Sequence, residues 1–185
     1  MQNTQEMKPD EDTAEAINLP GLEDVFSTTE EAVEFFQKFG ENGRTFRDFT
    51  ELSPESMEAF YMMAYNFYSS GKYEDAAKVF QLLCMLNHFE VKYWKGLGAS
   101  RENLKDYDGA LQAYGYLTMI DLHDPYPPFY GAKCLLALDR VDEAEAGLRA
   151  AIFNSEGKKE AAEMHQQASH LLSMLEKRKT RESAS

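Results

Sequence analysis

The stretch with the clearest potential for chemistry is Ser-Ser-Gly-Lys at residues 69–72, because a glycine–lysine pair can bind phosphate. A phosphate-binding P-loop also needs a glycine five residues before the second glycine and a serine or threonine after the lysine. Those positions hold Asn66 and Tyr73. The pair also lies between two predicted helices, whereas a P-loop follows a strand. We therefore predict no nucleotide-binding site here.

The histidines and cysteines do not have the spacing of a metal or redox site. His165 and His170 are five residues apart on one predicted helix, so they point to different faces. Cys84 and Cys134 lie in apolar helical patterns without a C-x-x-C motif, which predicts buried thiols and no disulfide. Because no nucleophile–base pair or glycine-rich nucleotide motif accompanies them, we predict that the protein is not an enzyme and binds no metal or cofactor.

The composition favours a soluble protein with protein partners. The formal net charge of −13 disfavours general binding to nucleic acid or anionic lipid, which depends on Lys and Arg. We interpret the basic cluster Lys177, Arg178, Lys179 and Arg181 as a solvated helix end that complements the helix dipole. The chain has no run of about 18 apolar residues and no signal-peptide pattern at its N-terminus. We therefore expect a cytoplasmic protein that does not insert into membranes.

Comparing the sequence with itself at an offset of 34 residues brings three segments into register. The coinciding sets are Tyr73, Tyr107 and Val141; Ala76, Ala110 and Ala144; Phe80, Tyr114 and Leu148; and the small residues Ala64, Gly98 and Ala132. The three predicted units are residues 57–90, 91–124 and 125–158.

Each unit has two apolar periodic runs with a break between them, which predicts two antiparallel helices joined by a tight turn. The breaks lie near Gly71, Lys105 and Asp139. A small residue near the middle of each helix allows close approach, and a large one fills the space beside it. This pattern resembles the tetratricopeptide repeat and predicts an all-α fold of three tandem helix pairs. The third unit departs from it at Pro128 and Leu148, although Asp124 can cap its first helix.

The segments outside the repeats complete the predicted organisation. Residues 1–24 are acidic and poor in aromatics, which predicts a disordered tail, and 25–56 form an N-terminal helical region. Residues 159–178 have the amphipathic pattern of a capping helix, which closes the open end of a helix stack. Residues 179–185 form a predicted flexible tail.

Three tyrosines stand out once the core of the first unit is assigned to Phe60, Met63, Ala64 and Phe67. Tyr61, Tyr65 and Tyr68 occupy positions i, i+4 and i+7 of the first helix, which point together into the concave side of a helix-pair stack. The corresponding positions of the other two units, also predicted to line this groove, are Lys95, Ala99, Glu102, Phe129, Lys133 and Leu136, with Tyr126 close by. Tyrosine combines a large contact area with a hydrogen-bonding tip, which suits an extended peptide with apolar anchors. Alternatively, the three tyrosines pack on the preceding helix.

A more specific resemblance than the repeat itself rests on three segments, residues 65–102, residues 124–148 and AVEFFQKFGENGRTF at 32–46. They resemble the class II type III secretion chaperones of Gram-negative bacteria, the SycD/LcrH and IpgC family. The likeness covers about residues 30–178 and excludes the acidic tail.

This resemblance implies a cytoplasmic chaperone that keeps two hydrophobic translocator proteins soluble and apart before secretion. Its groove would hold an extended segment of the translocator that contains proline and leucine. The client-binding residues carried over by position are Tyr61, Tyr65, Tyr68, Tyr73, Phe80, Leu83 and Leu86. It also implies a homodimer formed through the N-terminal region, at Val33, Phe36 and Phe39.

Alternatives remain open from the residues themselves. Tyr73 and Phe80 fall on the core pattern of the repeat, so they can equally be packing residues. Val33, Phe36 and Phe39 can cap the first repeat within one chain. The protein as a whole can also be a general repeat scaffold that assembles folded partners.

Overall fold

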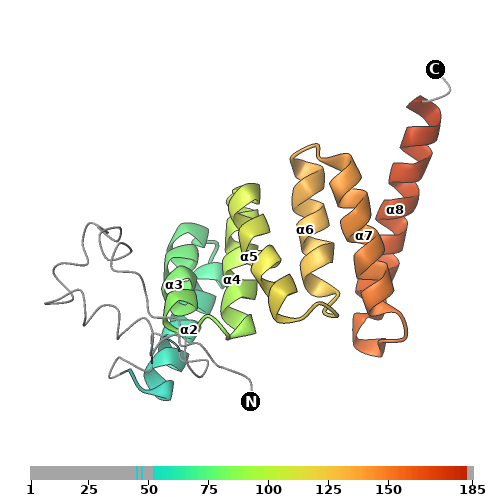
Figure 1. Cartoon of the computed structure of the whole chain (residues 1–185). Coiled ribbons are helices and arrows are strands. Elements are labelled where there is room, and N and C mark those ends of the chain that lie inside the picture. Colours follow the sequence, from blue (N-terminus) through green and yellow to red (C-terminus); the bar gives the residue numbers. More distant parts are fainter. Residues whose placement is uncertain (1–44, 46, 48–51, 183–185) are drawn as a thin grey trace, which may run out of the picture. The chain divides into compact units, whose positions relative to one another are not determined.

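The computed structural model describes residues 45, 47 and 52–182, and within them every regular element is helical. The helices are α2 (Pro54–Ser69), α3 (Tyr73–Leu86), α4 (Val91–Asn103), α5 (Tyr107–Ile120), α6 (Tyr126–Ala137), α7 (Val141–Ser155) and α8 (Ala162–Glu182), with a 3-10 turn η4 (Lys159–Ala161) before α8. Three antiparallel pairs, α2–α3, α4–α5 and α6–α7, are followed by a single last helix (Figure 1). The predicted all-α fold of three helix pairs and a C-terminal helix is confirmed.

Polar side chains define where several helices begin. Ser53 Oγ accepts a hydrogen bond from the backbone N–H of Ser56 at 3.2 Å, and Pro54 follows it in the first turn of α2. Asp124 Oδ1 accepts from the N–H of Tyr126 at 2.9 Å, although Asp124 lies one residue before the N-cap position, which Pro125 occupies. These side chains satisfy N–H groups that have no partner inside the helix.

The turn inside each pair is the same structure repeated three times. Gly71, Lys105 and Asp139 have φ angles of 75°, 61° and 58°, in the left-handed region. In the first pair the N–H of Lys72 donates to the carbonyl of Phe67 at 2.9 Å, and the N–H of Gly71 donates to that of Tyr68 at 3.0 Å. The equivalent bonds recur 34 and 68 residues later. This is the Schellman arrangement, so the Gly-Lys pair ends a helix and is no phosphate loop.

The residues that coincide at the 34-residue offset form the contacts inside and between pairs. Ala76, Ala110 and Ala144 have no exposed surface, and their large partners Phe80, Tyr114 and Leu148 are at most 2% exposed. A Cβ atom on Gly98 would lie 2.5 Å from the Tyr114 ring, so this ring occupies the space that the small residue leaves. The core of α2 differs from the prediction in one residue. Met63 is 39% exposed, whereas Met57 is buried, because Met57 lies two turns before Ala64 on the buried side.

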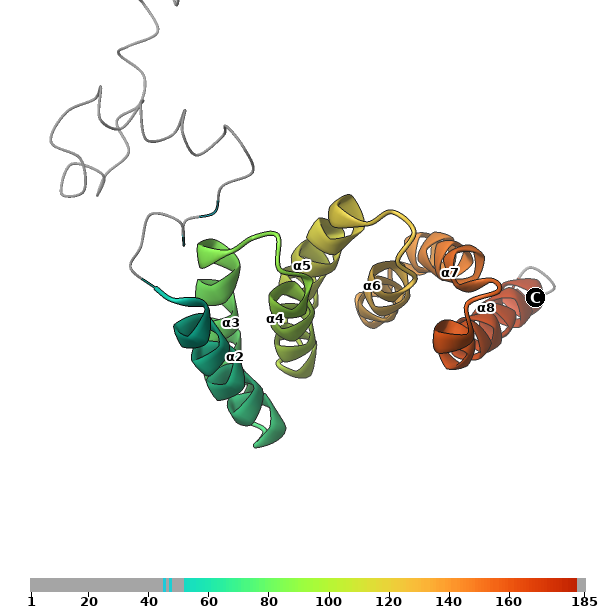
Figure 2. The same cartoon turned by 90° about the horizontal axis from the view of Figure 1, so that it is seen from below.

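The pairs are stacked in sequence order, so each helix packs mainly on its neighbours along the chain. Figure 2 shows α2, α4 and α6 on one side of the stack and α3, α5 and α7 on the other. Direct contacts between α2 and α4 keep these two first helices adjacent, and α6 contacts the last helix, α8, in the same way. Side chains of three different repeats can therefore meet on one surface.

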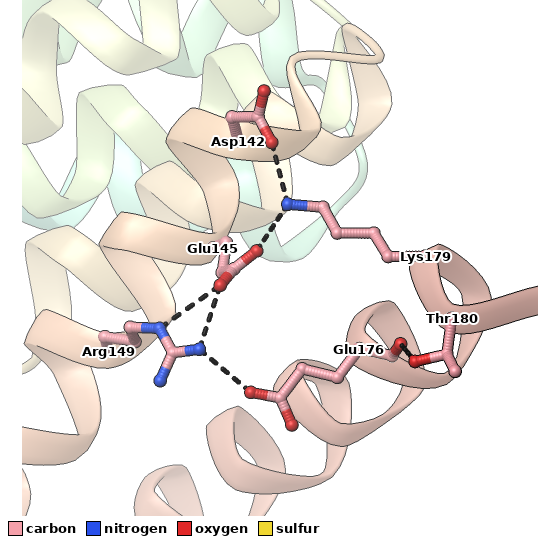
Figure 3. Close-up of polar contacts among 6 residues, drawn as sticks. All are labelled: Asp142, Glu145, Arg149, Glu176, Lys179 and Thr180. Carbon is pink, nitrogen blue, oxygen red and sulfur yellow. Dashed lines mark hydrogen bonds and ion pairs between the residues drawn. The ribbon is translucent and has the colours of Figure 1, made fainter. Parts of the chain in front are cut away.

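The last helix is held to α7 by apolar packing and by an ion-pair network. Leu172 and Leu175 pack against the buried cluster that contains Leu148. Lys179 Nζ lies 2.7 Å from Asp142 and 2.6 Å from Glu145, and Arg149 bridges Glu145 and Glu176, both at 2.9 Å (Figure 3).

The structure differs from two predictions for the end of the chain, the boundary of the last helix and the solvated basic cluster. The helix continues to Glu182, beyond the predicted boundary at residue 178. Lys179 is paired with α7, so it does not belong to a simply solvated helix end.

Candidate functional site: the first-helix face

A continuous surface is formed where side chains of the first helices touch one another; we call it the first-helix face. Its members are Tyr61, Tyr65 and Tyr68 of α2, Lys92, Lys95, Glu102 and Asn103 of α4, and Tyr126, Tyr130 and Lys133 of α6. Contacts link α2 to α4 through Tyr61–Lys92 and Tyr68–Asn103. Others link α4 to α6 through Lys95–Tyr126 and Lys133–Glu102. The face therefore spans all three repeats.

The three tyrosines of α2 contribute to this face to different degrees. Tyr61 is half-buried, with its ring centroid 6.0 Å from those of both Phe80 and Tyr93. Tyr68 is half-buried and accepts a hydrogen bond on its hydroxyl from Asn103 Nδ2 at 3.2 Å. Tyr65 is 51% exposed and contacts the Tyr61 ring at 6.5 Å between centroids. Tyr61 and Tyr68 thus also stabilise the fold, while Tyr65 has most of its surface free for a ligand.

Each lysine of the face lies over a tyrosine ring and beside a carboxylate. Lys92 Nζ is 4.4 Å from the Tyr61 centroid and 2.7 Å from Glu58. The hydrogen bond that Lys92 donates to the Glu58 carboxylate raises the pKa of Lys92. Such cation–π contacts hold the rings in place, and the paired carboxylates neutralise the positive charge.

The other two lysines repeat this arrangement farther along the stack. Lys95 Nζ is 4.5 Å from the Tyr126 centroid and 3.2 Å from Asp124. Lys133 Nζ is 4.7 Å from the Tyr130 centroid and 2.7 Å from Glu102. The face is therefore aromatic, with locally balanced charge.

The aromatic side chains of the third repeat lie close to the centre of the face. The Tyr126 and Tyr130 centroids are 4.2 Å apart, and each is 6.0 Å from the buried Tyr114. Burial raises the pKa of Tyr126, and the neighbouring Tyr130, Glu102 and Tyr68 add to the increase. Tyr126 and Tyr130 therefore form one aromatic cluster with Tyr114.

Several residues predicted to contact a client lie in the core. Phe80, Leu83, Leu86 and Phe129 are at most 8% exposed. The reason is packing between successive pairs, since the Phe80 ring fills the space directly over Gly96 of α4. These four residues have little free surface, so their role in this structure is packing in the core.

The remaining predicted residues are only partly buried. Tyr73 packs edge-on against Tyr68 at 5.4 Å between centroids, and Leu136 lies against the cluster around Phe129. The predicted dimerisation residues Val33, Phe36 and Phe39 lie outside the described residues.

The sequence did not single out Lys92, Asn103 or Tyr130 as members of this face. A signal for Lys92 existed, because its partner Glu58 lies 34 residues earlier, at the repeat offset. Asn103 and Tyr130 had no comparable signal, since their contacts depend on how the pairs are rotated against one another.

The described residues contain little that could support catalysis. No group of three or more His, Cys, Asp or Glu side chains among them is placed to hold a metal ion. Burial raises the pKa of the Cys84 and Cys134 thiols to about 12, which suppresses the reactive thiolate. His165 Nδ1 lies 3.0 Å from the buried Ser155 Oγ, so this histidine joins α8 to the end of α7.

On the opposite side of the stack lies a depression of about 460 Å³ between α3 and α5, beside Met85, Trp94 and Tyr116. No predicted client-binding residue lines it. Across residues 52–182, no helix combines the length and the apolar character needed to cross a bilayer.

The repeat pattern and several known proteins match this chain. The tetratricopeptide repeat family model matches residues 57–88 and 91–124, which coincide with the first two predicted units. The chain is 38% identical over 146 residues to the low calcium response locus protein H of Yersinia pestis. That match covers 79% of this chain and 87% of the relative.

Solved structures are similar over most of their length. One is a type III secretion system complex from Aeromonas hydrophila, with a TM-score of 0.75 and 34% identity, covering 80% of this chain and 98% of that chain. Another is the translocator chaperone SycD of Yersinia enterocolitica with a peptide of the translocator YopD. Its TM-score is 0.67 at 40% identity, covering 70% of this chain and 99% of SycD.

The third is PcrH of Pseudomonas aeruginosa, solved with the chaperone binding region of PopD. It has a TM-score of 0.67 and 37% identity, covering 70% of this chain and 97% of PcrH. PcrH has also been solved with the chaperone binding region of PopB.

Proposed function

Because this chain belongs to the class II translocator chaperones of type III secretion systems, the family of LcrH, SycD and SicA, we propose that it binds hydrophobic translocator proteins before secretion. The observation that carries the proposal is that relatives of 37–40% identity are solved with translocator segments bound. Binding keeps the clients soluble and apart in the cytoplasm, by occupancy of their apolar segments and without catalysis or cofactor.

We assign client binding to the first-helix face. Tyr65 is the most exposed of its three α2 tyrosines, and Tyr126, Lys95 and the partly buried Leu136 extend the contact toward the third repeat. Aromatic rings flanked by ion-paired lysines suit an extended segment that inserts apolar side chains and forms hydrogen bonds through its backbone. Direct client contacts were also predicted for Phe80, Leu83, Leu86 and Phe129. Because these side chains are buried, we propose that they act indirectly, by stabilising the helices that form the face.

We also propose that the protein forms a homodimer. The support is that SycD has been solved in more than one dimeric arrangement, one of them called an alternative dimer. Val33, Phe36 and Phe39 remain the proposed contact residues.

The test is co-expression with each translocator produced by the same bacterium. We expect the translocator to move from the insoluble to the soluble fraction and to co-purify with this protein. Combined replacement of Tyr61, Tyr65 and Tyr68 by alanine should abolish co-purification. An insoluble translocator, or co-purification of folded partners only, would contradict the chaperone function and favour a general scaffold.

A further inference from the structure

The polar centre of the first-helix face is the carboxylate of Glu102, near the end of α4. Its Oε2 atom accepts a hydrogen bond from the Tyr114 hydroxyl of α5 at 3.1 Å. Its Oε1 atom accepts from Lys133 Nζ of α6 at 2.7 Å. One carboxylate therefore joins α4 to its own partner helix and to the next repeat.

The neighbouring residue extends this connection to the first repeat. Asn103 Nδ2 donates to the Tyr68 hydroxyl of α2 at 3.2 Å and to the backbone carbonyl of Ala99 at 2.8 Å. Two consecutive residues of α4 thus hold polar contacts with α2, α5 and α6.

This connection is not part of the repeat. The residues 34 positions before and after Glu102 are Tyr68 and Leu136, and those equivalent to Lys133 in the first two units are Tyr65 and Ala99. Stacked helix pairs are held together by contacts that recur in every unit. The Glu102–Lys133 bridge has no equivalent at the repeat offset, so it adds a contact that the repeat does not require.

Burial makes the Glu102 carboxylate difficult to replace. Tyr114 is 1% exposed, and a buried hydroxyl needs an acceptor. The Glu102 side chain is 21% exposed and Lys133 is 40% exposed, so the bridge lies between core and surface. A bond to a charged group at this depth is stronger and more directional than one in water.

We propose that Glu102 is a positioning residue that fixes the third repeat against the second, and through the second repeat sets the separation of the first and third repeats on the first-helix face. The proposal rests on the proposed function in one respect: a client segment that crosses α2, α4 and α6 needs Tyr65 and Tyr126 at a constant distance. Glu102 acts on that distance through its neighbours, because each of its two oxygens accepts a hydrogen bond from a neighbouring helix.

The test measures the inter-repeat distance without any client. Spin labels are attached to cysteines introduced at Met62 of α2 and Ala137 of α6, two exposed positions. The native thiols Cys84 and Cys134 are buried and do not compete for the label. We expect Glu102→Ala to broaden or shift the distance distribution measured by pulsed electron resonance. Glu102→Gln should retain most of it, because the amide oxygen can still accept from Lys133 and the amide N–H can donate to the Tyr114 hydroxyl.

A matched control and a second variant keep the result interpretable. Glu143→Ala removes the same charge and breaks an ion pair of 2.6 Å with Arg140 that lies within α7, so it should leave the distance unchanged. If Glu102→Ala fails to fold, Lys133→Met removes only the contact to α6 and should still shift the distance. An unchanged distribution in a folded Glu102→Ala or Lys133→Met variant overturns the proposal.

Affinity for a synthetic YopD peptide, of the kind bound by SycD, is the second readout. We expect Glu102→Ala to weaken binding about tenfold, as the loss of a charge-assisted hydrogen bond allows, and Glu102→Gln to restore most of it. Equal affinity of wild type and a folded Glu102→Ala variant would contradict the role in client binding. If the wild type does not bind the peptide but the distance shifts in the variants, the positioning role holds and the proposed client fails.

Discussion

Replacing Tyr65 by alanine separates client binding from folding more cleanly than any other change on the first-helix face. Tyr65 is 51% exposed, while Tyr61 and Tyr68 pack against the first core cluster. Its ring contact in the structure is with Tyr61, at 6.5 Å between centroids. Truncation therefore removes mostly surface that faces solvent.

The magnitude follows from the area that a client can cover. A fully buried aromatic side chain removes about 150–250 Å² from water, so the exposed half of Tyr65 offers on the order of 100 Å². At about 25 cal/mol per Å², covering it is worth at most ~2.5 kcal/mol, and part of this is lost to ordering costs. We expect the dissociation constant to rise about 5- to 60-fold, which corresponds to ~1–2.5 kcal/mol. The free energy of unfolding should fall by less than about 1 kcal/mol, because only one ring contact is lost.

The assay is titration calorimetry with a translocator peptide, together with urea unfolding of the same preparations. Phe153→Ala is the matched control, since Phe153 is an aromatic residue of α7 that is 74% exposed and lies outside the first-helix face. It should change neither quantity appreciably. An unchanged affinity for Tyr65→Ala, or an equal loss for Phe153→Ala, would refute the assignment of client binding to this face.

Two further predictions concern the turns and the last helix. Lys105 holds a left-handed φ of 61°, so Lys105→Gly should raise the free energy of unfolding by about 0.5–1 kcal/mol in urea titrations, whereas Gly71→Ala should lower it by about 1 kcal/mol. Hydrogen bonds from Lys179 and Arg149 lower the pKa of Glu145 below 4.5, so its contribution is present above that pH and is lost as the pH falls through the lowered pKa. The difference in unfolding free energy between wild type and Glu145→Gln should therefore stay constant above about pH 5 and disappear in more acidic solution, and a difference that grows toward low pH would contradict this network.

Much of the fold could be predicted because it depends on local, recurring chemistry. The offset of 34 residues placed the small residues, their large partners and the turns, and the second helices begin at the three coinciding positions Tyr73, Tyr107 and Val141. Backbone turns and apolar periodicity involve residues close in sequence, so one chain is enough to locate them.

The candidate site was predicted less completely, because exposure depends on the next helix pair. The sequence placed Phe80 and Tyr65 in one set of client contacts. Tertiary packing separates them, since Phe80 fits over Gly96 and is 2% exposed, whereas Tyr65 remains 51% exposed. Periodicity tells which residues face inward within a pair but not how deeply the following pair covers them.

The sequence by itself determined the repeat, the all-α fold and the resemblance to the translocator chaperones. Only the tertiary structure decided that Glu102 joins Tyr114 and Lys133, and that Lys179 anchors the last helix to α7. The physical reason is that Lys133 and Lys179 lie 31 and 34 residues from Glu102 and Glu145, their partners in sequence-distant helices. The rotation and spacing of stacked helices bring such partners together, and these result from the packing of the whole stack.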